Sequence, residues 1–275
     1  MTPHHITTLY PVLAGDRRLT LARVGLPETL RVAVRAVLAP KPGGAIDTDI
    51  IPGDRFAVHA REDGWAYGQS LFDGYAGWLP SASLAPTGPA PTHVVTAPRS
   101  FVYEAASLKS PPLAALPLNA EVAVAAVEGD YARLADGGFV HRAHLAPLGT
   151  FAPDWVAVAE ALAGVPYLWG GVSPEGLDCS GLVQTALRRA GMLAPRDSDM
   201  QAKALGRDVP VTEDFRGLRR GDLVCWKGHI GIMRDPVMLL HANAHHMMVA
   251  TEPLAGAAER IAGSGSGPVT AIRRL

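Results

Sequence analysis

The sequence has few cysteines, almost no net charge and no segment suited to crossing a membrane. Only two of its 275 residues are cysteine, too few for a disulfide framework in a chain of this size. The formal net charge is −1, so the composition offers no basic surface for nucleic acid or an anionic membrane. The longest uncharged run, residues 74–98, contains five prolines and therefore cannot form a membrane helix. The composition predicts neither nucleic acid nor a membrane as a partner.

The N-terminus also lacks a recognisable secretion signal. Residues 1–18 have no basic start followed by an apolar core. Together with the scarcity of cysteine, this favours a cytoplasmic protein. The hydrophobic fraction of 48% and the charged fraction of 19% are typical of a soluble globular chain, and its length suits two or three compact units.

Two small parts of the chain repeat each other. The segment GWLPSASLAP at residues 77–86 matches GFVHRAHLAP at residues 138–147. Short β-rich runs in both parts alternate with Asp-Gly turn signals, which is typical of small all-β units. After an N-terminal extension, 1–29, we expect two small all-β barrels in tandem, at residues 30–86 and 93–147.

The remaining part, residues 151–275, has a different character. A helical pattern at residues 155–163 is followed by a second one that starts near Cys179. Strand-like runs come next, at residues 222–226, 229–233 and 237–242. Helices followed by an antiparallel sheet predict an α+β domain.

Cys179 lies where the second of these helices should begin. In DCSGLVQTALRRAG, four apolar residues share one face at helical spacing, and Gly191 suits the C-terminal cap. Free backbone N–H groups and the helix dipole favour an anion in a first turn, and such a position can lower a thiol pKa below its usual value of about 8.5. A buried structural cysteine is the alternative, and position alone does not decide between them.

A cysteine nucleophile needs a base and a group that orients the base. His229 begins one predicted strand and His241 lies on the next, so a hairpin can bring the two imidazoles together. We expect Cys225, inside an apolar strand, to be a buried core thiol. His241 and His245 are four residues apart, but no metal motif accompanies them, so we predict no metal and no cofactor. The other histidines are interpreted as surface or satisfied core residues: His4, His5, His93, His141 and His144.

Three motifs in the last part resemble the NlpC-type, papain-like cysteine peptidases, which cut peptidoglycan stem peptides. They are YLWGG with DCSGL, then GDL with HIGI, then LLHA, in that order along residues 151–275. The repeats resemble bacterial SH3-like domains, which often precede this catalytic domain. The whole architecture is similar to that of the γ-D-glutamyl dipeptidyl peptidases of murein peptide recycling.

The resemblance implies a role for individual residues. Cys179 becomes the nucleophile, His229 the general base and His241 its orienting partner. The Tyr167 hydroxyl, with the Cys179 backbone N–H, would stabilise the oxyanion. Asp54, where the family usually has Glu, and Tyr75 would close the substrate's amino end from the first barrel. The remaining substrate contacts would come from Trp169, Asp178, Ser180, Asp197 and Ser198.

These implications predict a monomeric cysteine peptidase. Its substrates would be murein stem peptides, L-Ala-γ-D-Glu-diamino acid, cut at the γ-D-glutamyl bond when the L-Ala amine is free. Three alternatives stay open: a secreted endopeptidase whose barrels anchor it to intact cell wall, a non-catalytic module that binds murein peptides, and an acyltransferase or amidase on the same scaffold.

Overall fold

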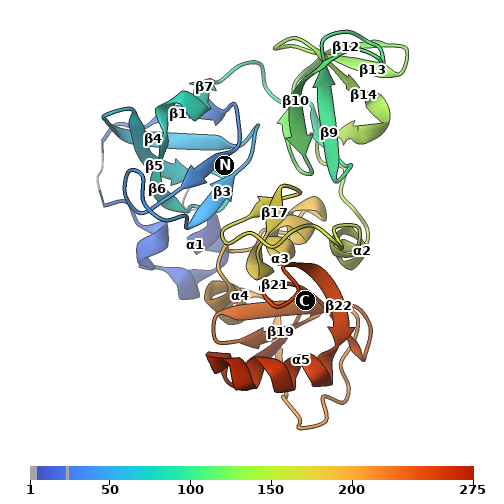
Figure 1. Cartoon of the computed structure of the whole chain (residues 1–275). Helices are drawn as coiled ribbons and strands as arrows, with labels where there is room; N and C mark the ends of the chain where they lie inside the picture. Colours follow the sequence, from blue (N-terminus) through green and yellow to red (C-terminus); the bar gives the residue numbers. More distant parts are fainter. Residues whose placement is uncertain (1–4, 23–24) are drawn as a thin grey trace. The chain divides into compact units, whose positions relative to one another are not determined.

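The computed structural model describes residues 5–22 and 25–275, so His4 and the side chain of His5 lie outside the description. The chain forms two units (Figure 1). One unit holds Gly15–Phe151, and the other holds Ala152–Leu275 together with Ile6–Ala14. No helix in the described residues is long and apolar enough to cross a membrane.

The start of the chain is divided between the two units. The Tyr10 hydroxyl donates a 2.5 Å hydrogen bond to the Leu193 carbonyl, which ties this segment to the second unit. Gly15–Phe151 belong to the first unit. The N-terminal extension expected at residues 1–29 is therefore divided between the two units, and its exact boundary stays a prediction. The helical turns here are α1 (His5–Leu9), η1 (Pro11–Leu13) and η2 (Arg17–Leu19).

The first half of the first unit is an antiparallel sheet of five strands in the order β6-β5-β4-β1-β7, with a separate pair β2-β3. The predicted turn at Asp63-Gly64 joins β4 to β5, and both residues have positive φ, as tight hairpin turns require. Phe56 and Leu79 are fully buried in the core of this half. The strands are β1 (Glu28–Val32), β2 (Ala36–Leu38), β3 (Thr48–Ile50), β4 (Arg55–Glu62), β5 (Trp65–Ser70), β6 (Ala76–Pro80) and β7 (Leu84–Pro86).

The second half of this unit also consists of strands, in a five-stranded sheet β10-β9-β14-β13-β12 and a three-stranded sheet β11-β8-β15. Val95 and Val140 are fully buried in its own apolar core. The strands are β8 (His93–Val95), β9 (Arg99–Tyr103), β10 (Pro112–Pro117), β11 (Glu121–Val122), β12 (Val124–Glu128), β13 (Tyr131–Leu134), β14 (Phe139–His141) and β15 (Leu145–Pro147).

The sequence repeat corresponds to a structural repeat. In the first copy, β6 is followed by the 3-10 turn η3 (Ser81–Ser83) and then by β7. In the second copy, β14 is followed by the 3-10 turn η4 (Arg142–His144) and then by β15. Matching segments of sequence thus form the same succession of strand, turn and strand.

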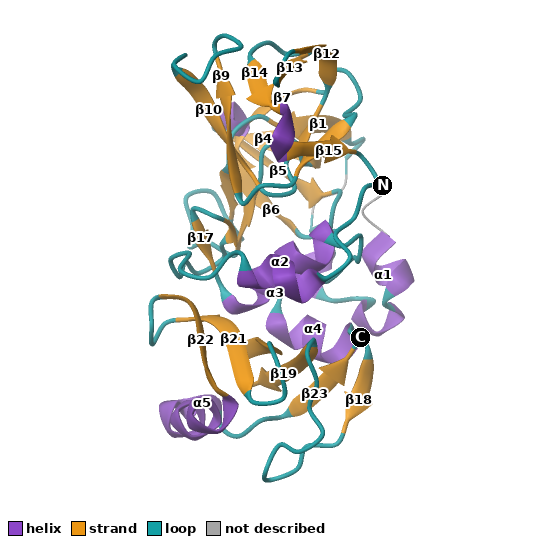
Figure 2. Cartoon of the chain, turned by 90° about the vertical axis from the view of Figure 1, so that its right-hand side faces the viewer, coloured by secondary structure: helices purple, strands orange, loops and turns teal. Residues whose placement is uncertain are grey.

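In the second unit, within Ala152–Leu275, three helices precede the antiparallel sheet, as predicted, but a fourth helix, α5, lies between the last two strands in the chain. Six strands form the sheet β18-β23-β19-β20-β21-β22. Helix α3 packs on β20 and β21, while α5 contacts β21 and β22 and lies on the other side of the sheet (Figure 2). The helices are α2 (Trp155–Glu160), α3 (Cys179–Arg189), α4 (Ser198–Ala204) and α5 (Leu254–Ile261), with a π-helical turn η5 (Ala262–Ser266). The strands are β16 (Val172–Ser173), β17 (Gly176–Leu177), β18 (Arg207–Val209), β19 (Asp222–Trp226), β20 (His229–Met233), β21 (Met238–Asn243), β22 (Met248–Pro253) and β23 (Ala271–Arg274).

Helix α3 has the boundaries that the sequence predicted. It begins at Cys179 and ends at Arg189, and Gly191 follows with φ of 78°. The Met192 N–H bonds the Leu187 carbonyl, as in a glycine-terminated helix end. The four apolar residues expected on one face are all buried: Leu182, Val183, Ala186 and Leu187.

Candidate active site

The Cys179 thiol lies in the first turn of α3, against the beginning of β20. The residue is 8% exposed, and the backbone N–H of Ile230, the residue after His229, is among the groups that act on its pKa. Asp178 is the N-cap, and its carboxylate accepts a 2.7 Å hydrogen bond from the Gly181 N–H. Cys179 thus lies at a capped helix start and next to the strand that carries His229.

The ionisation of this thiol differs from the expectation of a lowered pKa. Burial, and next the negative charge of Asp178, raise the pKa of Cys179 to about 12, and the Ile230 and Ser180 N–H groups with Arg196 only partly oppose them. The sequence places the thiol at a helix start but does not reveal its burial or the acid that faces it. The thiol is therefore neutral at pH 7 in the substrate-free protein.

The two predicted histidines are directly hydrogen-bonded. Nε2 of His229, on β20, lies 2.8 Å from Nδ1 of His241, on β21. A Cβ at Gly231 would lie 2.7 Å from the Leu239 side chain and 3.2 Å from the Cβ of His241, so glycine leaves the space that His241 occupies. The hairpin expected from the sequence therefore brings the two imidazoles together.

Both imidazoles are neutral near pH 7. Burial, and secondarily the charges of His241 and Arg260, lower the pKa of His229 to about 3. Burial also lowers the pKa of His241 to about 4, although Glu252 acts in the opposite direction. A neutral imidazole has a lone pair, so His229 is in the form that accepts a proton from a neutral thiol.

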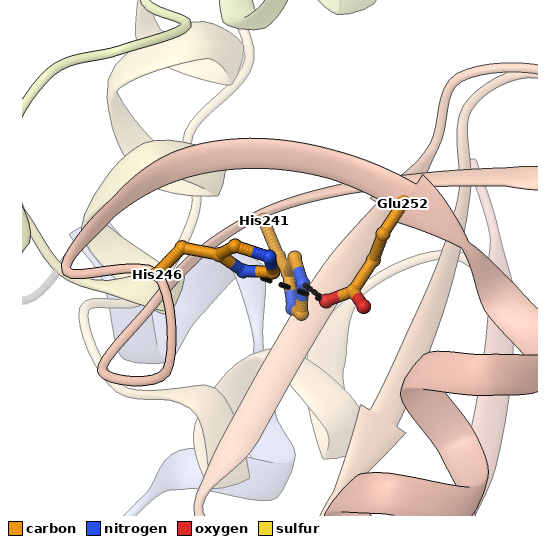
Figure 3. A group of neighbouring side chains, drawn as sticks. All are labelled: His241, His246 and Glu252. Atoms are coloured by element: carbon orange, nitrogen blue, oxygen red, sulfur yellow. Dashed lines mark hydrogen bonds and ion pairs between the residues drawn. The ribbon is translucent and has the colours of Figure 1, made fainter.

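Glu252, on β22, extends this pair and was not identified from the sequence. Its Oε1 lies 2.8 Å from Nε2 of His241 (Figure 3). Glu252 pairs across the sheet with Leu239, two residues before His241, so the contact depends on the register of β21 and β22. The sequence does not reveal this register, and a separation of eleven residues does not by itself indicate that His241 and Glu252 are in contact.

A second network, around Arg196, holds the residues that flank the nucleophile. The Arg196 guanidinium is 1% exposed and pairs with both oxygens of Asp178, at 3.0 and 2.6 Å. It also donates to the Ser180 hydroxyl, which in turn donates to Asp178. Asp178 further accepts from the Gly170 N–H at 2.8 Å. The side chains of Asp178 and Ser180 thus form hydrogen bonds within the protein, and their contact with substrate stays a prediction.

The segment that carries Tyr167 runs beside β22. The backbone N–H of Gly164 donates to the Val249 carbonyl, and the backbone N–H of Tyr167 donates to the Met247 carbonyl at 2.9 Å. Burial, and next the charges of Cys179 and Asp178, raise the pKa of the Tyr167 hydroxyl to about 12. The phenol therefore keeps its proton and can donate a hydrogen bond. Trp169, predicted as a wall of the substrate pocket, is 64% exposed.

Close backbone contacts require glycine before and inside α3. A Cβ at Gly181 would lie 2.0 Å from the Gly171 carbonyl oxygen, and one at Gly171 would lie 2.3 Å from the Gly176 carbonyl oxygen. The loop that precedes the nucleophile therefore packs directly on the first turn of its helix. The sequence did not indicate that the backbone of this glycine-rich stretch packs on the helix.

The other predicted substrate contacts occupy two different places. Asp197 is the N-cap residue of α4 and Ser198 is its first residue. Asp54 and Tyr75 lie in the first unit, where they are 8% and 3% exposed, and Tyr75 packs in the apolar core. The Asp54 carboxylate accepts a hydrogen bond from the Ile51 N–H at 3.3 Å. The predicted roles of all four residues in substrate binding stay predictions.

Among the described residues, one group of three side chains lies close enough to share a cation: His241, His246 and Glu252 (Figure 3). The group includes His246 instead of His245, the residue that the sequence spacing singled out. Arg260 already donates to Glu252, and His246 Nδ1 lies 3.1 Å from the Asn243 side-chain oxygen. Cys225 is fully buried, as expected for a core thiol.

Comparison with known proteins identifies similarity in both units. Residues 164–260 match the NlpC/P60 family, and residues 38–84 match the bacterial dipeptidyl-peptidase Sh3 domain. The gamma-D-glutamyl-L-lysine dipeptidyl-peptidase of Bacillus subtilis (strain 168) is 30% identical over 226 residues, which is 72% of each chain. The protein of the same name from Bacillus cereus is 28% identical over 203 residues, 65% of this chain and 59% of that one.

Solved structures share the fold. The crystal structure of an NlpC/P60 family protein from Bacillus cereus ATCC 10987 superposes with a TM-score of 0.72, at 19% identity, over 90% of this chain and 99% of that one. An NlpC/P60 endopeptidase from Photobacterium damselae superposes with a TM-score of 0.60, at 13% identity, over 98% of this chain and 74% of that one.

Proposed function

Because the chain belongs to the NlpC/P60 family of cysteine peptidases, we propose that it cleaves the γ-D-glutamyl–diamino acid bond of murein-derived peptides with a free N-terminal L-Ala. The names of two relatives, gamma-D-glutamyl-L-lysine dipeptidyl-peptidases, support this choice of bond. The observation that carries the proposal is the His229–His241 hydrogen bond on strands that pack against the start of α3.

In the proposed reaction Cys179 is the nucleophile and His229 is the general base. His229 takes the thiol proton as sulfur attacks the γ-carbonyl carbon, and the carbonyl oxygen becomes an oxyanion. The Tyr167 hydroxyl and the Cys179 backbone N–H donate hydrogen bonds to that oxyanion. The C–N bond then breaks, and His229 returns the proton to the leaving amine. Water, deprotonated by His229, hydrolyses the thioester and releases the dipeptide.

A neutral resting pair suits this sequence of steps. The raised pKa of Cys179 and the lowered pKa of His229 keep the proton on sulfur until a substrate is present. Attack and proton transfer then occur together, since an isolated thiolate is unfavourable in this buried site. The neutral thiol also limits reaction with other electrophiles between turnovers.

The first unit is assigned to recognition in this proposal. We include Asp54 and Tyr75, with Asp197, as the groups that receive the L-Ala amine, and Trp169, Asp178, Ser180 and Ser198 as further substrate contacts. The second β-rich half, residues 93–147, is proposed as a second SH3-like barrel, supported by the repeated strand, 3-10 turn and strand. We also propose that the protein acts as a monomer in the cytoplasm, in the recycling of murein peptides. Cell fractionation tests the location, and light scattering tests the oligomeric state.

The direct test is incubation with L-Ala-γ-D-Glu-L-Lys and with the diaminopimelate peptide, followed by mass spectrometry. We expect L-Ala-γ-D-Glu and the free diamino acid. Cys179→Ala should abolish hydrolysis, because it removes the nucleophile. Cys225→Ala is the matched control: it should stay active and lose at most a few kcal/mol of stability through a small cavity. Equal loss of turnover in both variants, with unchanged melting, would contradict the assignment of Cys179.

The same assay separates a dipeptidyl-peptidase from a wall endopeptidase. N-acetylation of L-Ala removes the positive charge that a carboxylate would pair with, so the acetylated peptide should be cut much more slowly. Asp54→Asn should narrow the difference between the two substrates. Equal rates on the free and acetylated peptides in the wild type, or release of fragments from intact peptidoglycan, would favour the endopeptidase.

A further inference from the structure

The hydrogen-bonded chain that starts at His229 does not end at His241. Glu252 Oε1 lies 2.8 Å from Nε2 of His241, and Arg260, on α5, donates to the same oxygen. His241 is fully buried, and the side chains of Glu252 and Arg260 are 17% and 28% exposed. We propose that Glu252, held by Arg260, is a positioning residue that fixes the tautomers of His241 and His229 and so determines which nitrogen of His229 accepts the thiol proton.

The argument rests on which atoms can donate. A carboxylate only accepts hydrogen bonds, so Nε2 of His241 carries its proton and Nδ1 presents a lone pair. His229 Nε2 lies 2.8 Å from that Nδ1 and must therefore carry a proton as well. The lone pair of neutral His229 is then on Nδ1. Glu252 thus orients the whole relay toward a base at Nδ1 of His229.

Without Glu252, His241 and His229 can adopt the opposite pair of tautomers. His241 can then hold its proton on Nδ1 and donate it to Nε2 of His229. In that arrangement the proton of neutral His229 lies on Nδ1, and this nitrogen has no lone pair for the thiol proton. Loss of a carboxylate two hydrogen bonds from the reacting atoms would therefore stop general-base catalysis while the nucleophile and base remain in place.

Charge supports the same role. Arg260 on α5 forms an ion pair with Glu252, and the other titratable groups that face the relay are His246, 3.8 Å from Glu252, and Asp178 at the start of α3. When His229 takes the thiol proton, the relay becomes positive, and the Glu252 carboxylate stabilises that charge through His241. Because burial opposes a charge on either imidazole, this compensation is needed at the moment of attack.

A shared cation is the competing interpretation of His241, His246 and Glu252. A cation on Nε2 of His241 would place the proton on Nδ1 and reverse the relay, which would block the base. Arg260 already supplies the positive charge at the Glu252 oxygen that a cation would need. We therefore favour the relay, and the experiment includes a metal arm.

The test compares Glu252→Ala and Glu252→Gln with Glu160→Ala, a matched control. Glu160 is a carboxylate in the same unit that forms ion pairs with Arg220 and Arg234. Within the described residues it forms no ion pair or hydrogen bond with His229 or His241. We expect Glu252→Ala to lower kcat about 10²- to 10⁴-fold with little change in KM, as for loss of general-base catalysis. Glu252→Gln keeps one acceptor oxygen for His241 but replaces the other oxygen with an NH₂ group and loses the charge, so it should retain about a tenth of kcat. Glu160→Ala should keep full activity.

Substrate-free measurements separate this inference from the proposed function on which it rests. Long-range ¹H–¹⁵N spectra of the wild type should show both His229 and His241 as Nε2–H tautomers, whatever the true substrate is. His241 should change to the Nδ1–H form in Glu252→Ala. A wild-type His241 with its proton on Nδ1, or full kcat in a folded Glu252→Ala, would overturn the proposal. Activity lost to EDTA and restored by Zn²⁺ would overturn it too, in favour of a metal site.

Discussion

At the scale of single residues, environment decides the chemistry of Cys179 more than position does. A first-turn location favours the thiolate, but burial and Asp178 oppose it and prevail. The base has the complementary shift, since burial lowers the pKa of His229 to about 3. Catalysis therefore depends on proton transfer within the complex with substrate rather than on a preformed thiolate.

The raised pKa of Cys179 predicts how the thiol reacts in the absence of substrate. In the Cys225→Ala background, iodoacetamide should label Cys179 slowly at pH 7, and the rate should keep rising beyond pH 9, because the thiol pKa is raised. The measurement is the alkylation rate by mass spectrometry from pH 5 to 10. A rate that reaches its plateau below pH 7 would instead indicate a preformed thiolate–imidazolium pair.

At the scale of elements, the start of α3 depends on backbone contacts that admit no side chain. A Cβ at Gly181 would collide with the Gly171 carbonyl oxygen of the preceding loop, and a Cβ at Gly171 would collide with the Gly176 carbonyl oxygen within that loop. The Asp178 carboxylate caps the helix and joins it to Arg196, which is almost fully buried. The nucleophile is therefore held by the loop, the cap and the ion pair together.

Gly181→Ala tests this dependence. The new Cβ would lie 2.0 Å from the Gly171 carbonyl oxygen, so the loop must move, at a cost of about 1–3 kcal/mol, and activity should fall strongly. Gly256→Ala, in α5, is the control, because a Cβ there has no neighbour within 4 Å and alanine favours a helix by roughly 0.5–1 kcal/mol. The measurements are the melting temperature and kcat of both variants. Wild-type values of both quantities in Gly181→Ala would show that the close contact with Gly171 is not needed.

At the scale of the molecule, the buried histidines couple folding to pH. The pKa of His241 is lowered to about 4 in the folded protein, against about 6.5 when unfolded, so the unfolded chain binds the proton first as the pH falls. This part of the stability is fully present above pH 7 and is lost progressively between about pH 6.5 and 4, by up to about 3 kcal/mol.

Urea unfolding of the wild type and of His241→Gln at a series of pH values tests this coupling. The wild-type midpoint should fall from pH 7 to pH 4.5 more steeply than that of His241→Gln, because the variant has lost the group that titrates. Parallel curves would mean that His241 does not contribute to the pH dependence of folding.

The sequence by itself determined the division into two repeated β-rich parts and one part with helices and a sheet, helix α3 with its glycine end, the strands at residues 222–226 and 229–233, and the segments that bear Cys179, His229 and His241. These follow from local periodicity, capping and motif spacing, which are properties of neighbouring residues. The tertiary structure alone decided that Glu252 and Arg260 meet His241, that Arg196 pairs with Asp178, and that burial raises the Cys179 pKa. Such contacts depend on strand register and on what covers each side chain, and these are fixed only when distant segments pack together.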